Sequence, residues 1–370
     1  MADREVARVH GEVVANARDR SPWWNKSRWA SITPMDSHSS DPTQAFFALT
    51  PERVLSAVER LGTRCTGRVL QLNSMENRVY EVELDIDLPP DAGRWDAYRV
   101  VKFYRPGRWS KQQIDEEHEF LRDATAAELP VVQPIPFADG STVETVDHAP
   151  ILYTVFPKVA GRIRDELADE ELEQIGRLIA RLHNIGSTKR FEHRLRLTVD
   201  SYGFENLAYL KQNNLIPASV EQHYMRVAER IFTVTRDWFS DVPLQRIHGD
   251  CHLGNILWQG ARCFMVDFDD SLMGPPIQDL WLLTPGRDED SLRRQDLIIR
   301  GYSSMRPFDH SSARLREPLR ALRMVHFTTW IAKRFEDPAF KRVFVDYGTE
   351  RYWRDQLTAL QEVGECLGIG

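Results

Sequence analysis

The sequence lacks several features that would place it in other classes of protein. No apolar run approaches the ~18 residues of a membrane-spanning helix, and the N-terminus has no apolar segment typical of signal peptides. The four cysteines match neither a zinc pattern nor a CxxC pair. Acidic residues outnumber basic ones by 55 to 48, and the net charge of −7 argues against a nucleic-acid partner. These absences predict a cytoplasmic protein with reduced thiols and no membrane segment.

The length and composition are those of a globular protein, except at the N-terminus. A chain of 370 residues, 42% of them apolar, is long enough for two lobes with a sizeable core. Residues 1–45 carry no periodic apolar face, so we predict a disordered tail that is dispensable for folding and catalysis. We also predict that Met35 could be the start of the natural protein. Trp23, Trp24 and Trp29 favour the alternative that the segment docks on the body or on a partner.

The stretch from His248 to Trp258 carries the clearest chemical pattern. Asp250 lies five residues before Asn255, Asp267 follows twelve residues later, and short apolar runs flank each group, which predicts three short strands. Phosphoryl transfer from ATP needs a carboxylate that accepts a proton, and an amide plus a second carboxylate that hold Mg²⁺. The spacing Asp-x4-Asn is that of the kinase catalytic loop, with Gly249 where protein kinases usually carry arginine. The alternative is a polar turn with unrelated acids nearby.

Lys102 and Glu117 extend this pattern towards the nucleotide. Lys102 lies in a predicted apolar strand, where an unpaired lysine is costly to bury. Ser110 and Gln113 form a capping box that predicts a helix, and Glu117 falls in the middle of its apolar stripe, with Glu116 near the edge. Pairing Lys102 with Glu117 would satisfy both groups, and a kinase needs this pair to hold the α- and β-phosphates. The alternative is a solvated lysine and an unrelated glutamate.

The loop Asn73-Ser-Met-Glu-Asn77 lies where kinase folds cover the ATP phosphates with a strand, a loop and a strand. It contains no glycine, so the usual Gly-rich signature is missing. Backbone N–H groups and the Ser74 hydroxyl could still contact phosphate oxygens, although most such loops are plain hairpins.

The predicted elements give an α+β, bilobal, protein-kinase-like fold. A helix that begins at Pro51, with Thr50 as its cap, would come first. Strands at 68–73, 78–86, 98–103, 131–137 and 151–156 would form a small antiparallel sheet in an N-lobe over 46–157. Residues 156–162 would be the hinge, and 158–370 a mostly helical C-lobe. Within it, we predict His183 as a hydrogen-bonded core residue and Asp279 as a helix cap.

These segments resemble the aminoglycoside phosphotransferase and choline kinase-like superfamily, and within it the stress response kinase A family. The resemblance covers about residues 50–352 and rests on the segments 73–80, 100–106, 116–120, 248–258, 266–270, 279–281 and 317–323. It implies ATP- and Mg²⁺-dependent phosphorylation of protein Ser or Thr, autophosphorylation and a role in bacterial stress survival. Asp250 would be the catalytic base, Asn255 and Asp267 would bind Mg²⁺, with Asp267 also an active-site residue, and Ser74 would contact ATP. Family chains begin near the position of Met35, and we expect a monomer.

Two other functions stay open. Only eleven residues separate Asp267 from Asp279 and no Ala-Pro-Glu follows, so a typical activation segment has no room. This favours a kinase of a small molecule, such as an amine, an amino-alcohol or an aminoglycoside. The acids Asp269, Asp270, Asp288, Glu289 and Asp290 could attract its cation. A peptide acceptor would have to bind through the helical lobe. The third hypothesis is a nucleotide-sensing pseudokinase. The presence of all the polar residues that catalysis needs argues against it: Lys102, Glu117, Asp250, Asn255 and Asp267.

Overall fold

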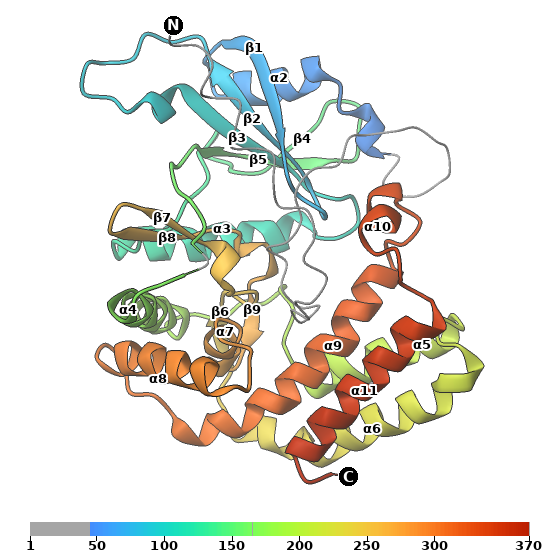
Figure 1. Cartoon of the computed structure of the whole chain (residues 1–370). Coiled ribbons are helices and arrows are strands. Elements are labelled where there is room, and N and C mark those ends of the chain that lie inside the picture. Colours follow the sequence, from blue (N-terminus) through green and yellow to red (C-terminus); the bar gives the residue numbers. More distant parts are fainter. Residues whose placement is uncertain (1–44, 165, 370) are drawn as a thin grey trace, which may run out of the picture.

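The computed structural model describes residues 45–164 and 166–369 (Figure 1). The predicted tail, with Trp23, Trp24 and Trp29, lies outside these residues. Within them, a five-stranded antiparallel sheet precedes a mostly helical part, which confirms the predicted fold class. The lobe boundaries at 46–157 and 158–370 stay a prediction.

The sheet has the order β1-β2-β3-β5-β4 and places Lys102 on its central strand. Its strands are β1 (Cys65–Leu72), β2 (Arg78–Leu84), β3 (Tyr98–Phe103), β4 (Glu144–Thr145) and β5 (Leu152–Pro157). In the antiparallel register, Lys102 pairs with Val79 on β2 and with Thr154 on β5. Helix α2 (Pro51–Glu59), which Thr50 caps as predicted, packs on β1. The sheet therefore holds the lysine firmly between two neighbouring strands.

The strand predicted over residues 131–137 is wrong. Val131 forms only an isolated bridge with Met265, and Ile135 donates one hydrogen bond to Val155. Pro134 and Pro136 lack an N–H group, so this segment cannot form a continuous ladder.

Helix α3 (Lys111–Ala126) lies below the sheet and begins at the predicted capping box. The backbone N–H of Ser110 donates to Gln113 Oε1 at 2.9 Å, and the N–H of Gln113 donates to Ser110 Oγ at 3.3 Å. The buried face of the helix includes Ile114, Phe120 and Glu117. The helix thus presents a carboxylate to the interior, as the sequence predicts.

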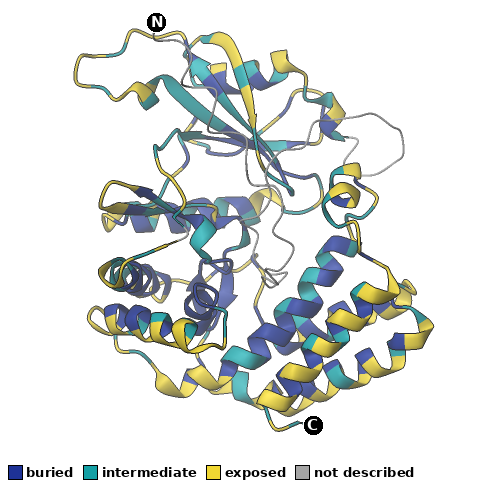
Figure 2. Cartoon of the chain, viewed as in Figure 1, coloured by how far each residue is buried: buried dark blue, intermediate teal, exposed yellow. Residues whose placement is uncertain are grey.

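The helical part forms two groups below the sheet (Figure 1). Its helices are α4 (Asp169–Gly186), α5 (Glu205–Gln212), α6 (Ala218–Ser240), α7 (Ile277–Trp281), α8 (Glu289–Ser303), α9 (Arg316–Ala332), α10 (Pro338–Val343) and α11 (Glu350–Cys366). In one group α4 packs against α8, and α6, α9 and α11 pack together in the other. Figure 2 shows α9 mostly buried, whereas the outer sides of α6 and α8 are exposed. No helix in the described ranges is long and apolar enough to cross a membrane.

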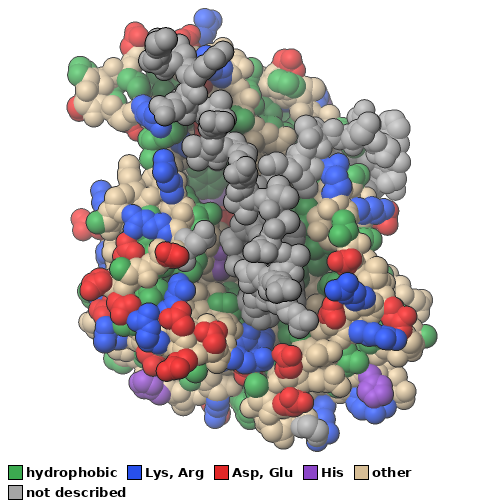
Figure 3. All heavy atoms as spheres, in the orientation of Figure 1, with side chains coloured by type: hydrophobic (Ala, Val, Ile, Leu, Met, Phe, Trp, Pro, Cys, Tyr) green, Lys and Arg blue, Asp and Glu red, His purple; other side chains and the backbone are tan. Residues whose placement is uncertain are grey.

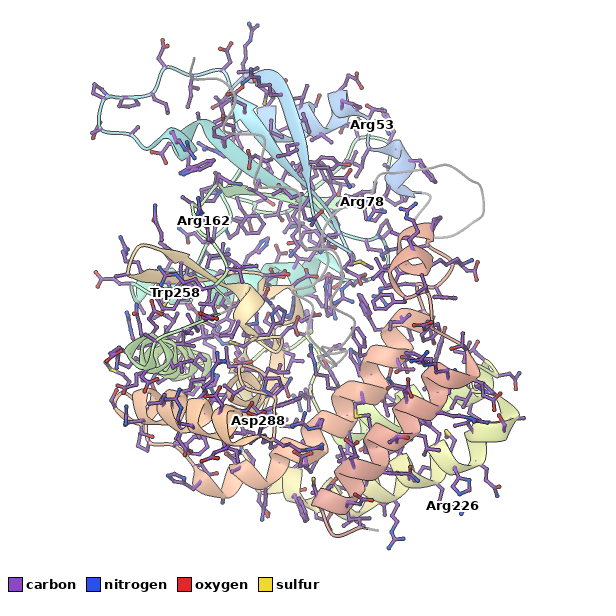
Figure 4. The ribbon with its side chains drawn as sticks, viewed as in Figure 1. Arg53, Arg78, Arg162, Arg226, Trp258 and Asp288 are labelled. Carbon is purple, nitrogen blue, oxygen red and sulfur yellow. The ribbon has the colours of Figure 1, made fainter. Side chains whose placement is uncertain are left out.

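Two short ribbons carry the predicted catalytic segments. Strand β6 (Gln245–Ile247) pairs with β9 (Leu272–Gly274), and β7 (Ile256–Gln259) pairs with β8 (Arg262–Met265). Residues 248–255 and 266–271 each connect one ribbon to the other. The segment after β5 joins β7 through Arg162, whose backbone exchanges hydrogen bonds of 3.0 and 2.8 Å with Trp258 (Figure 4).

Candidate active site

The loop that carries Asp250 is anchored from below by Asp279 on α7. The backbone N–H groups of His248 and Gly249 each donate to the Asp279 carboxylate at 2.8 Å, and His183 Nε2 lies 3.1 Å from it. Asp279 is fully buried and lies inside α7, so the predicted helix cap is wrong, whereas the prediction of a hydrogen-bonded His183 is confirmed. Gly249 has φ +83°, and a Cβ atom there would lie 2.2 Å from the Asp270 carbonyl oxygen. Glycine is therefore required at this position.

Asp250 is buried and is bound by an arginine that the sequence did not reveal. Arg323 Nη2, on α9, donates to Asp250 Oδ1 at 2.8 Å, and His252 Nε2 lies 3.6 Å from Oδ2. The Asn255 amide donates to the Asp250 carbonyl oxygen at 2.9 Å, which closes the loop. Arg323 follows Asp250 by 73 residues, so no local sequence pattern could have revealed the pair.

The β7–β8 ribbon brings Asn255 and the segment of Asp267 together. The backbone N–H of Val266 donates to the Asn255 carbonyl oxygen at 3.1 Å, which places Asp267 one residue beyond this contact. Asp267 adopts left-handed backbone angles, φ 62° and ψ 64°, which are unusual for a residue with a Cβ atom. Its side chain is 59% exposed, in contrast to its buried neighbour Asp269.

These residues fit a magnesium ion that is shared with phosphates. The Asn255 side-chain nitrogen is engaged in the loop, so the side-chain oxygen Oδ1 is the atom that could serve as a metal ligand, and the backbone contact with Val266 links Asn255 to the segment of Asp267. Mg²⁺ in nucleotide sites takes one or two protein oxygens, with phosphate oxygens and water as the other ligands. Among the described residues there is no group of three or more His, Cys, Asp or Glu side chains that could hold a metal alone. The donor set therefore suits a metal that arrives with a nucleotide.

Lys102 pairs with aspartates rather than with Glu117. Its Nζ lies 3.0 Å from Asp269 Oδ1 and 3.5 Å from Asp267 Oδ1. Glu117 accepts instead from Arg194 Nη1 at 3.3 Å, and no ion pair joins Glu117 to Lys102 in the described structure. The predicted direct pair is therefore wrong. The reason is that two buried groups from distant segments, Asp269 and Arg194, supply closer partners.

The charges of this cluster perturb one another strongly. Burial alone would lower the pKa of Lys102, but the carboxylates, Asp269 foremost, raise it well above its usual value. Burial raises the pKa of Glu117 to about 7, although Lys102 and Arg194 oppose the shift. Burial would also raise the pKa of Asp269, but Lys102 and Arg108 hold it well below its usual range. Lys102 therefore stays cationic and Asp269 anionic at neutral pH, and strongly perturbed groups of this kind are typical of functional sites.

The loop between β1 and β2 is tied to both the acid cluster and the helical part. Ser74 Oγ accepts from the Asn77 backbone N–H at 3.3 Å, and the Asn77 amide donates to Asp269 at 3.2 Å. Glu76 accepts from Trp330 Nε1, in the last turn of α9, at 2.8 Å and from Arg334 Nη2, just beyond that helix, at 2.9 Å. The loop thus closes over the region of Lys102 and Asp267 without any glycine. Sequence reasoning missed Glu76 and Asn77, although the polar composition of the loop was a signal.

A cavity lies beside Asp250. Its lining includes Gly249 and Asp250 from the loop, Asp270 beyond β8, and Arg323 and His326 from α9. The structure therefore brings Asp250 to a hollow lined mainly by helical residues, while Lys102, Asp267 and Asp269 gather at the sheet side.

Comparisons with known proteins agree with this geometry. The sequence profile described as "Phosphotransferase enzyme family" matches residues 69–348. Stress response kinase A of Escherichia coli (strain K12) is 36% identical over 323 residues, which cover 87% of this chain and 94% of that protein. "Serine/threonine protein kinase RdoA" of Salmonella typhimurium is 36% identical over 329 residues, which cover 89% of this chain and 96% of that protein.

Solved structures with the same fold include two small-molecule kinases. An amicoumacin kinase in complex with AMP-PNP, Ca²⁺ and its ligand has a TM-score of 0.65 at 18% identity, and the match covers 83% of this chain and 95% of that one. A microcompartment-associated aminopropanol kinase has a TM-score of 0.60 at 18% identity, and the match covers 84% of this chain and 100% of that one. At this identity the likeness shows the fold. The family match and the curated relatives together show that the chain belongs to the phosphotransferase enzyme family and, within it, to the stress response kinase A family.

Proposed function

We propose that this protein is an ATP- and Mg²⁺-dependent serine/threonine kinase of the bacterial stress response that also phosphorylates itself. The observation that carries the proposal is the anchored Asp250 loop, whose carboxylate lines a cavity, together with the hydrogen bond that joins Asn255 to Val266, the residue before Asp267. Proteins named stress response kinase A and serine/threonine protein kinase RdoA, similar over most of their length, support the assignment. The proposal includes a monomer that acts in the cytoplasm.

Each site residue has a role in this proposal. Asp250 accepts the proton of the attacking hydroxyl, and Lys102 binds the α- and β-phosphates. Asn255 and Asp267 would hold Mg²⁺, which when bound neutralises charge on the phosphates. Ser74 contacts ATP from the loop above. Glu117 acts on Lys102 through its charge, because Arg194 is its direct partner. The AMP-PNP and Ca²⁺ of the amicoumacin kinase support the use of a nucleotide with a divalent cation.

A small-molecule phosphotransferase is the second candidate. The amicoumacin and aminopropanol kinases, which share the fold, favour it, and so does the short segment between Asp267 and Asp279. The name of the serine/threonine protein kinase RdoA, at twice their sequence identity, favours a protein acceptor.

The two candidates are separated by offering a bacterial proteome and a metabolite extract to the protein with γ-³²P-ATP and Mg²⁺. We expect label on phosphoserine or phosphothreonine of proteins, the kinase included. Label confined to metabolites would establish the small-molecule alternative, and the absence of both label and ADP would indicate a pseudokinase. The Asp250→Asn variant is the matched control for contaminating kinases.

A further inference from the structure

The cavity beside Asp250 carries charged groups that are already paired. It is lined by two carboxylates, Asp250 and Asp270, and by two arginines, Arg323 and Arg108. Arg323 binds Asp250 at 2.8 Å, and Arg108 forms an ion pair with Asp270. Each carboxylate of the described lining thus has an arginine partner. Both carboxylates are therefore already neutralised by an arginine. The charge of a cationic acceptor would stay unpaired in this cavity, and burying an unpaired charge is costly.

The two arginines are themselves held in place. Arg108 has Glu76 at 3.5 Å and Asp269 at 3.7 Å in addition to Asp270, which ties it to the acid cluster. Burial would lower the pKa of Arg108, but the surrounding carboxylates raise it above its usual value. The buried Nε of Arg323 has no hydrogen-bond partner among the described residues. The positive charges of the Arg323 and Arg108 guanidinium groups at this wall repel an ammonium group.

The remaining wall is aromatic and aliphatic. Tyr202 and His326 stack with ring centroids 4.2 Å apart, and Phe327 stacks on Trp330 at 5.4 Å. Burial lowers the pKa of His326 to about 3, and burial raises that of Tyr202, so both rings are uncharged at neutral pH. Leu319 and Leu322 complete this side. Such a surface binds apolar groups by their removal from water.

The acids that the sequence suggested for a cationic acceptor have other partners. Asp269 binds Lys102, and Asp270 binds Arg108. Asp288 caps α8 through the Ser291 N–H at 2.9 Å, and Figure 4 shows it at the start of that helix, well away from Arg78 near the sheet.

We propose that this cavity takes an acceptor hydroxyl that is flanked by an uncharged, apolar group, and that it discriminates against acceptors whose hydroxyl lies beside an ammonium. In a protein this means Ser or Thr followed or preceded by an aliphatic or aromatic residue rather than by Lys or Arg. The inference rests on the proposed function, because it names the acceptor for Asp250.

The test uses the full chain and a library of peptides with a central Ser and one variable neighbour on each side. Phosphopeptides are quantified by mass spectrometry, and 1-amino-2-propanol and choline serve as ammonium-bearing acceptors. We expect kcat/KM for Phe- or Leu-flanked Ser to exceed that for Lys-flanked Ser about tenfold or more, which corresponds to ~1.4 kcal/mol. Preference for Lys-flanked peptides, or transfer to no peptide while ATP turnover persists, would overturn the inference.

A matched pair of variants tests the cavity itself. Phe327 is partly exposed and lines the cavity, so Phe327→Glu adds a carboxylate with little burden on the core, and Phe327→Gln is its uncharged control. Phe327→Glu should raise the use of Lys-flanked Ser relative to Phe-flanked Ser about tenfold over Phe327→Gln. Equal preferences in both variants would show that the cavity is not the acceptor site. Efficient phosphorylation of aminopropanol by the wild type would overturn the protein-kinase proposal as well, whereas labelled proteins with basic flanks would overturn the acceptor inference alone.

Discussion

At the residue scale, the site depends on charged pairs formed between distant parts of the chain. The sequence indicated that Lys102 and Glu117 both face inward, and the structure agrees that both are buried. It could not indicate their partners, because Asp269 and Arg194 lie 167 and 77 residues away from them along the chain, counted from their residue numbers. Periodicity indicates which way a side chain faces, whereas the nearest opposite charge depends on tertiary packing.

The partner of Lys102 can be tested by double-mutant cycles on the free energy of unfolding. Lys102→Met with Asp269→Asn should show coupling of about 0.5–3 kcal/mol, because these groups are in direct contact. Lys102→Met with Glu117→Gln should show the smaller coupling, since Arg194 is the direct partner of Glu117. A larger coupling with Glu117 would contradict the observed pairing and restore the one predicted from sequence.

Glu117 should also make stability depend on pH. Its pKa, ordinarily 4.5, is raised by burial to about 7 in the folded protein, so the folded state binds the extra proton between these values. Stability from this group is therefore fully present below pH 4.5 and is lost as pH rises through 7. The free energy of unfolding of the wild type, relative to Glu117→Gln, should be larger at pH 5.5 than at pH 8. Denaturant titrations at the two pH values measure it, and a difference that does not change with pH would contradict the shift.

At the scale of elements, the sequence predicted correctly those features that depend on neighbouring residues alone. Thr50 and Ser110 predicted the starts of α2 and α3, because a capping residue acts within one helical turn. Asp279 was misread as a cap, because its partners, His248 and Gly249, lie about 30 residues earlier in the chain. The apolar content of residues 131–137 suggested a strand, but the prolines in that segment lack the N–H groups that a strand needs. Three strands of the two short ribbons, β6, β7 and β8, were predicted, but β9 and its pairing with β6 required the tertiary structure.

The loop of residues 73–77 should be held by Glu76. Glu76→Gln keeps the shape of the side chain but removes its charge among Arg105, Arg108 and Arg334. We expect faster hydrogen exchange of the loop amides, a higher KM for ATP and a lower Tm, because breaking a buried pair costs roughly 3–5 kcal/mol. Glu83→Gln is the control, because Glu83 accepts hydrogen bonds from the Thr66 and Tyr98 hydroxyls within the sheet and, among the described residues, forms none with the loop. Equal exchange of the loop in both variants would show that Glu76 does not hold it.

At the scale of the whole molecule, the sheet and the helical part are joined through the site. Arg105, after β3, donates to Asp337 before α10 at 2.9 Å, and Glu76 reaches the end of α9. On the visible face, Figure 3 shows basic and acidic side chains interspersed over the helical part, in keeping with charges that are largely paired. Composition and motif order were sufficient to predict a sheet followed by helices. The contacts between the two parts could not be predicted, because no sequence period encodes them.

The central claim is that Asp250 is the base of an ATP-dependent phosphoryl transfer, and one measurement tests it most directly. Turnover with Mg²⁺ and ATP is compared among the wild type, Asp250→Asn and Asp288→Asn, and the dissociation constant for ATP is measured in parallel. Asp288→Asn is the matched control, because Asp288 only caps α8. Asp250→Asn should lose turnover by roughly 10²–10⁴-fold, the usual contribution of a positioned general base, and should still bind ATP. Turnover of Asp250→Asn close to that of the wild type would contradict the account.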